Sequence, residues 1–97
     1  MKAIAYVSIT PIGKGESVSE YVARAVRVIK ESGLSFELTP MGTIIAGDSV
    51  MEVFDVINDA IEALGDCNRL SISIKIDYRR NREGELKDKV ISVTKKL

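Results

Sequence analysis

The sequence predicts an α+β fold with the element order β-α-β-β-α-β, followed by one more short helix. Three observations support this prediction. Residues 18–33 and 50–64 repeat apolar side chains at intervals of three and four, as amphipathic helices do. Residues 70–78 alternate strictly between apolar and polar side chains, which is typical of a half-buried strand. Residues 34–47 form two short strand-like runs around a turn, which predicts a hairpin between the two helices.

The first half of the chain contains three strands and one helix. Residues 2–10 are rich in Val, Ile and Tyr and lack helical periodicity, so we expect a strand. The helix beginning near Val18 ends before Gly33, which suits the left-handed position that follows many helices. The alternating segment 34–39 and the segment 43–47 are then joined by a tight turn containing a proline and a glycine.

The second half contains a helix, a strand and a terminal helix. Gly65 closes the helix that begins near Val50. On the following strand the apolar set, which we expect to face the helices, is Leu70, Ile72, Ile74 and Ile76. The polar set on its other side is Ser71, Ser73, Lys75 and Asp77. A short terminal helix is predicted by the spacing of Leu86, Val90, Val93 and Leu97.

Two β-α-β units joined by a hairpin form a ferredoxin-like arrangement. Because such crossovers are right-handed, both helices should cover one face of a four-stranded antiparallel sheet. A chain of 97 residues has the length of one domain, and we expect residues 1–97 to form a single one.

The composition argues against several classes of function. The 14 basic and 14 acidic side chains balance, whereas nucleic-acid-binding proteins usually carry a basic excess. The chain has no histidine, and its single Cys67 can form neither an intramolecular disulfide nor a cysteine metal cluster. No apolar run is long enough to span a membrane, and the N-terminal segment turns polar sooner than a signal peptide does. We therefore expect a cytoplasmic protein without metal, cofactor or enzymatic activity.

The segment PIGKGESVSEY, at residues 11–21, resembles a phosphate-binding loop. Its glycine spacing does not match the P-loop pattern, however, because one residue separates the glycines and no Ser or Thr follows the lysine. Ser17 with Glu20 matches the S-x-x-E capping box, and Ser49 with Glu52 repeats that match before the second helix. We therefore interpret the segment as a turn and helix cap rather than a phosphate site.

The sheet face that the two helices leave open is the better candidate for a site. If the first strand turns Ala3, Ala5, Val7 and Ile9 to the helices, its other side carries Ile4, Tyr6, Ser8 and Thr10. An open face that is partly apolar predicts a homo-oligomer interface, because such patches are usually covered. A small polar ligand could be held in that interface.

The segments SVSEYVARAVRVIKESGLSFELTPMGTIIAGD and SIKIDYRRNR, with KV near the end, resemble the thiamine-binding protein family, the small single-domain relatives of YkoF-like proteins. The resemblance runs from about Ile9 to Val93. It implies a ferredoxin-like fold, assembly into dimers or tetramers through sheet faces and edges, and binding of thiamine or its hydroxymethylpyrimidine part without catalysis. Relatives commonly carry a glutamate where this chain has Ala46, and the neighbouring carboxylate here is Asp48.

With this family's ligand in mind, Tyr6 would stack on a heteroaromatic ring and Asp77 would balance its positive charge. Hydroxyl groups would hydrogen-bond to its edge. The full set of predicted ligand-binding residues is Tyr6, Ser8, Thr43, Asp48, Ser73 and Asp77. The alternative is an oligomeric structural or regulatory module that binds no thiamine.

Overall fold

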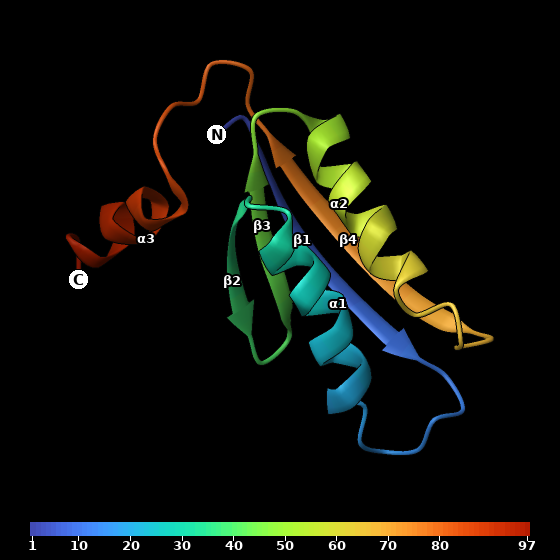
Figure 1. Cartoon of the computed structure of the whole chain (residues 1–97). Coiled ribbons are helices and arrows are strands. Elements are labelled where there is room, and N and C mark those ends of the chain that lie inside the picture. The colour runs from blue at the N-terminus through green and yellow to red at the C-terminus, as the bar shows by residue number, and fades with distance from the viewer.

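A computed structural model describes residues 1–97 and contains the elements that the sequence predicts, in the predicted order (Figure 1). They are β1 (Ala3–Pro11), α1 (Ser19–Glu31), β2 (Ser35–Thr39), β3 (Gly42–Gly47), α2 (Val50–Glu62), β4 (Leu70–Tyr78) and α3 (Leu86–Thr94). Boundaries agree with the prediction to within about two residues, except that α3 ends at Thr94 and the predicted helix reached Leu97.

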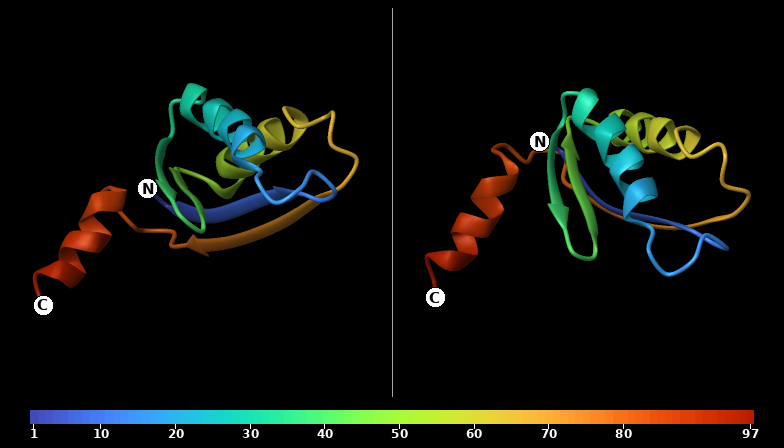
Figure 2. Two further views of the ribbon diagram at one scale, coloured as in Figure 1. Left: turned by 90° about the horizontal axis from the view of Figure 1, so that it is seen from below. Right: turned by 60° about the horizontal axis from the view of Figure 1, so that its bottom comes forward.

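The four strands form one antiparallel sheet with the spatial order β2-β3-β1-β4. Helices α1 and α2 lie side by side on one face of this sheet (Figures 1 and 2). We call this the helix face and the opposite one the open face. The arrangement confirms the predicted ferredoxin-like fold.

Alternation along β1 decides what each face carries. Ala3, Ala5, Val7 and Ile9 are buried toward the helices, as predicted. They join residues of both helices in the core, of which the largest fully buried side chains are Ile29, Ile45, Ile57, Leu64 and Val53.

The edge strand β4 is less well covered than its sequence suggests. Ile72 pairs with Ile9 and Ile74 pairs with Val7, so these isoleucines are on the helix face, as predicted. Their exposed fractions are nevertheless 38% and 40%. The two helices pack mainly over the inner strands, and β4 extends beyond them.

Half of one predicted capping box is present: Ser49 caps α2, but Glu52 accepts from the N–H of Asp48 and not from that of the cap residue. At α2, the Ser49 hydroxyl accepts a hydrogen bond from the Glu52 N–H at 3.1 Å, and Glu52 accepts one from the Asp48 N–H at 3.1 Å. At α1 the prediction for Ser17 is wrong. That helix begins one residue later than a Ser17 cap requires, because Val18 is the N-cap, and no side chain caps it.

Helix α3 stands apart from the rest of the fold. None of its residues is buried, and it projects away from the sheet on the side opposite α1 and α2 (Figure 2). No helix of the chain has the length and apolar character needed to cross a membrane.

Candidate functional site

Four of the six predicted site residues lie on the open face. Ser8 pairs with Ser73 across β1 and β4, and Asp77 pairs with Ile4 on the same side. Tyr6 lies between them on β1, opposite Lys75. The sequence pattern therefore placed these four side chains on the correct face of the sheet.

The tyrosine of this group is held by the neighbouring hairpin. Its hydroxyl donates to the backbone carbonyl of Met41 at 2.7 Å. Its ring lies directly over Gly42, where a Cβ atom would come within 2.6 Å of the Tyr6 Cε2 atom. Tyr6 thus already serves the structure by closing the end of the β2–β3 hairpin.

The carboxylate of Asp77 is paired within its own chain. Its Oδ2 atom lies 3.1 Å from Lys89 Nζ and 3.4 Å from Arg82 Nη1. The pKa of Asp77 lies below its ordinary value, chiefly because Lys89 donates a hydrogen bond to the carboxylate and places a positive charge beside it. Arg82 acts in the same two ways to a lesser extent. A carboxylate that two cations already contact has little charge left to offer a cationic ligand.

The other two predicted residues do not join this group. Thr43 pairs with Val7, so it is on the helix face, and the expectation that it shares a face with Tyr6 is wrong. The reason is its register: Thr43 lies one position before Ile44, the partner of Tyr6. Asp48 follows β3 in the loop that leads into α2, on the rim of a separate polar hollow of about 270 Å³.

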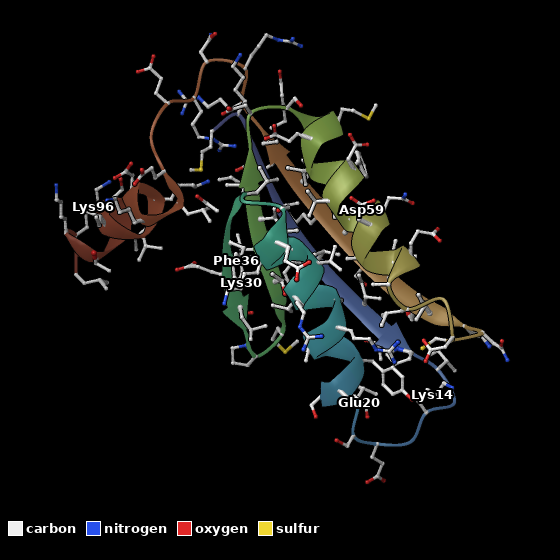
Figure 3. All side chains as sticks on the ribbon, viewed as in Figure 1. Lys14, Glu20, Lys30, Phe36, Asp59 and Lys96 are labelled. Atoms are coloured by element: carbon white, nitrogen blue, oxygen red, sulfur yellow. The ribbon has the colours of Figure 1, made fainter.

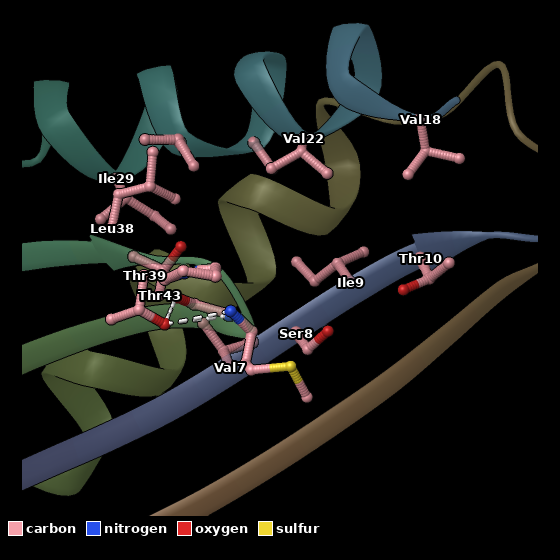
Figure 4. Close-up of a pocket in the computed structure, with 15 residues that line it drawn as sticks. Val7, Ser8, Ile9, Thr10, Val18, Val22, Ile29, Leu38, Thr39 and Thr43 are labelled. Carbon is pink, nitrogen blue, oxygen red and sulfur yellow. Dashed lines mark hydrogen bonds between the residues drawn. The ribbon is translucent and has the colours of Figure 1, made fainter. Parts of the chain in front are cut away.

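A mainly apolar cavity lies on the helix face, between α1 and the sheet. Its volume is about 260 Å³, and nine of its fifteen lining residues are hydrophobic. Val18 and Val22 point into it from α1, and Ile9 points toward them from β1, whereas Ser8 lies on the other side of that strand (Figure 4). The β2–β3 hairpin closes one end with Leu38, Thr39, Pro40 and Met41.

Four residues with hydroxyl groups line this cavity, Ser8, Thr10, Thr39 and Thr43, and only Thr43 is buried. Thr39 is committed to the hairpin, because its hydroxyl donates to the Gly42 carbonyl at 2.7 Å and accepts from the N–H groups of Met41 and Gly42. Thr43 is 5% exposed and its hydroxyl forms no hydrogen bond within the chain. Every fully buried side-chain polar atom has a partner, so the Thr43 hydroxyl must reach the cavity.

The α1 residues of this cavity are the ones that sequence reasoning missed. The sequence pattern places Val18 and Val22 in an apolar helix stripe, and such stripes usually pack into a filled core. The available signal was Thr43, a hydroxyl at the start of an apolar run on a strand that should face the helices.

The loop before α1 behaves as the predicted turn. Gly13 and Gly15 have φ angles of 87° and 85°, which only glycine adopts freely. Lys14 lies near the Tyr21 ring, with 5.9 Å between its Nζ atom and the ring centroid, at the far end of the molecule from α3 and Lys96 (Figure 3).

Two further charged side chains connect the helices. Arg24 and Asp66 make a two-pronged ion pair of 2.8 and 3.1 Å that joins α1 to the end of α2, and this hydrogen bonding lowers the pKa of Asp66. Cys67 packs against the hydrophobic core, and its Sγ atom lies 3.9 Å from the Asp66 carboxylate. No group of three or more potential metal ligands occurs.

Comparison with known proteins finds one family. The sequence profile described as "Thiamine-binding protein" matches residues 5–94. A UPF0045 protein of Methanocaldococcus jannaschii is 37% identical over 94 residues, which cover 95% of this chain and 92% of the relative. The UPF0045 protein YqgV of Bacillus subtilis is 38% identical over 102 residues, which cover 98% and 97%.

Solved structures share the fold. The crystal structure of the same M. jannaschii protein matches with a TM-score of 0.85 at 37% identity and covers 96% of both chains. A Thermotoga maritima protein, provisionally assigned to thiamine biosynthesis or salvage, matches with a TM-score of 0.81 and covers 96% of this chain and 99% of its own. Its identity is 20%, so this likeness concerns the fold alone.

Proposed function

This chain belongs to the thiamine-binding protein family, as its sequence resemblance predicted, and we propose that it is a non-enzymatic protein that binds thiamine or its hydroxymethylpyrimidine part. The observation that carries the proposal is the cavity under α1. It offers apolar walls that are open on one side and the buried hydroxyl of Thr43, which forms no hydrogen bond within the chain. Small-molecule sites commonly combine these features.

The cavity suits the pyrimidine half of the ligand better than the charged half. No Asp, Glu, Lys or Arg is among its lining residues, so a positive charge inside it would be unpaired. A flat ring with a methyl substituent can pack against Val22 and Ile9 while Thr43 hydrogen-bonds to its edge. The thiazolium ring would then extend toward solvent.

The open face is the competing position, built from Tyr6, Ser8, Ser73 and Asp77. We propose the cavity instead, because the chain itself uses the Tyr6 hydroxyl and the Asp77 carboxylate. Asp48 would belong to neither position.

Calorimetric titration with thiamine, its phosphates and hydroxymethylpyrimidine tests the proposal. We expect the parent chain to bind. Thr43→Val removes one hydroxyl at constant shape and should weaken binding about tenfold, or about 1.4 kcal/mol. Val22→Phe should abolish binding, because the larger side chain fills the cavity. The matched open-face control, Ser73→Ala, should bind like the parent. If Ser73→Ala weakens binding and Val22→Phe does not, the ligand is on the open face. If no compound binds, the proposed function is wrong.

We also propose that the chain self-associates into a dimer or tetramer. Its accessible surface is 6624 Å², whereas a compact monomer of 10.6 kDa exposes about 5,500 Å². Its radius of gyration is 14.3 Å against about 12.5 Å for a compact chain of this length. Light scattering at micromolar concentration checks this, and a monomer mass would contradict it. Self-association without binding of any tested compound would favour the alternative function, a structural or regulatory module.

A further inference from the structure

The tip of the β2–β3 hairpin lines one end of the cavity, yet the core holds it only weakly. Leu38 and Met41, which both line the cavity, are 61% and 77% exposed. Strand β2 is at the edge of the sheet, pairs with β3 alone, and has no buried residue. Segments with so little burial open at low cost in free energy, so the position of the tip depends on contacts outside the core.

The pairing of β3 with β1 stops short of this tip. Its last pair joins Thr43 to Val7, and Gly42 and Met41 lie beyond the end of the ladder. Thr39 bonds only within the hairpin, to Gly42 and Met41. The strand pairing therefore fixes the hairpin to β1 as far as Thr43 and no further.

One side chain bridges the gap, and it comes from the open face. Tyr6 pairs with Ile44, and Gly42 is the next position of β3 on that same face. The ring extends past Ile44 to Gly42, and the hydroxyl donates to the Met41 carbonyl at 2.7 Å. Tyr6 thus fixes the two residues that precede Thr43 and that the ladder leaves free.

The contact between this ring and Gly42 is close. A Cβ atom at Gly42 would come within 2.6 Å of Cε2 and 2.9 Å of Cζ of the ring, so only a glycine allows the approach. Tightly packed groups of this kind transmit small displacements to one another. A movement of Tyr6 would therefore move the backbone of Gly42 and, with it, the next residue.

That next residue supplies the buried hydroxyl of the cavity. Thr43 lies beside Thr39 at the hairpin end of the cavity, on the face opposite to Tyr6 (Figure 4). A hydrogen bond weakens steeply once its angle falls below about 120°. The direction of the Thr43 hydroxyl is therefore sensitive to small shifts of the residues before it.

We propose that Tyr6 is a positioning residue for the ligand cavity. From the open face it holds the hairpin tip, so that the Thr43 hydroxyl on the helix face meets the ligand. The inference rests on the proposed function and deepens it, because it gives Tyr6 a role in binding without contact with the ligand. This role replaces the ring stacking that the sequence predicts for Tyr6.

A double-mutant cycle, measured by calorimetric titration with hydroxymethylpyrimidine, tests the inference. Tyr6→Phe keeps the ring, removes the bond to Met41, and should weaken binding about fivefold in the parent chain. In the Thr43→Val background the same change should alter binding by less than about twofold, because the group that Tyr6 positions is absent. Tyr78→Phe is the matched control. It removes a tyrosine hydroxyl at the other end of β1, where Tyr78 pairs with Ala3, and should leave binding unchanged in both backgrounds.

The cycle separates positioning from the other ways in which Tyr6 could act. If Tyr6→Phe binds like the parent chain, the inference is wrong and the proposed function stands. If Tyr6→Phe weakens binding equally with and without the Thr43 hydroxyl, Tyr6 contacts the ligand directly or acts through overall stability, and positioning is again overturned. A parent chain that binds none of the tested compounds overturns both proposals.

Discussion

The two faces of the sheet are built from the same strands, yet they differ in what the chain can do with them alone. Ile45 is fully buried on the helix face, and Ile44, its neighbour on β3, is only half-buried on the open face. Helix α1 and the β2–β3 hairpin line a cavity on one face, whereas no helix covers the other face, which carries the ion pairs of Asp77. Under the proposed function, the helix face would hold a small ligand within a single chain, because its cavity is lined by α1 and the hairpin.

The difference between the two faces also explains why the predicted site residues do not lie together. Thr43 alternates away from Tyr6 into the enclosed side, while Asp77 remains on the open side and pairs with Lys89. Residue types suited to a ligand occur on both faces. Enclosure, rather than residue type, distinguishes the two.

The largest expected effect compares the adjacent isoleucines of β3. Ile45→Ala empties a fully buried position and should lower the free energy of unfolding by about 2–5 kcal/mol. Ile44→Ala, measured by the same urea denaturation at a concentration where the chain is monomeric, should cost about 1 kcal/mol or less, because its surroundings are open. Equal losses would mean that the open face is as well packed as the helix face.

A second prediction concerns the close approach of Tyr6 to the hairpin. Gly42→Ala brings a Cβ atom to 2.6 Å from the ring and 2.8 Å from the Val7 carbonyl oxygen, so the strand or the ring must move. We expect a loss of about 1–3 kcal/mol in thermal unfolding. The matched change Tyr6→Phe, which removes only the hydroxyl bond to Met41, should cost about 0.5–1.5 kcal/mol. A silent Gly42→Ala would show that the ring does not lie over the hairpin.

The third prediction concerns the two helices that cover the helix face. Ser49→Ala removes an observed cap of α2 and should cost about 1 kcal/mol in urea denaturation. Ser17→Ala should change stability little, because Ser17 caps nothing. An equal loss from both variants would mean that Ser17 does cap α1.

Much of this fold could be predicted because local patterns were consistent with the tertiary structure. The period of two along residues 70–78 gives β4 with the same bounds, and Gly33, with a φ angle of 82°, ends α1 as expected. The alternation in β1 assigned Tyr6 and Ser8 to the open face correctly. Periodicity determines which face a side chain is on.

Periodicity does not determine what lies opposite that side chain. The partners of Asp77 come from Arg82 and Lys89, in a loop and helix whose direction no local pattern specifies. The cavity is lined by α1, β1 and the β2–β3 hairpin, and no local pattern in the sequence specifies how closely these segments pack. The prediction that Ser17 caps α1 is wrong because the S-x-x-E pattern begins one residue before the N-cap, which is Val18.

The smallest expected effect is the pH dependence of the Asp77 contact, which anchors α3 to the open face. The folded pKa of Asp77 is held below its ordinary value of 3.8, chiefly by the hydrogen bond from Lys89. The contact therefore stabilises α3 above the unfolded pKa, and this contribution is lost as pH falls through the folded pKa. Asp77→Asn should increase hydrogen exchange in α3 at neutral pH, and the difference from the parent should shrink as pH falls through the folded pKa of Asp77, because the parent side chain then becomes neutral as well. The effect is small because the pair is exposed and solvent screens it.

Glu37→Gln, an exposed open-face change without an ion pair, serves as the control and should leave α3 exchange unchanged. A difference between Asp77→Asn and the parent that persisted at low pH would show that Asp77 acts by packing or hydrogen bonding as a neutral group, and not by its charge.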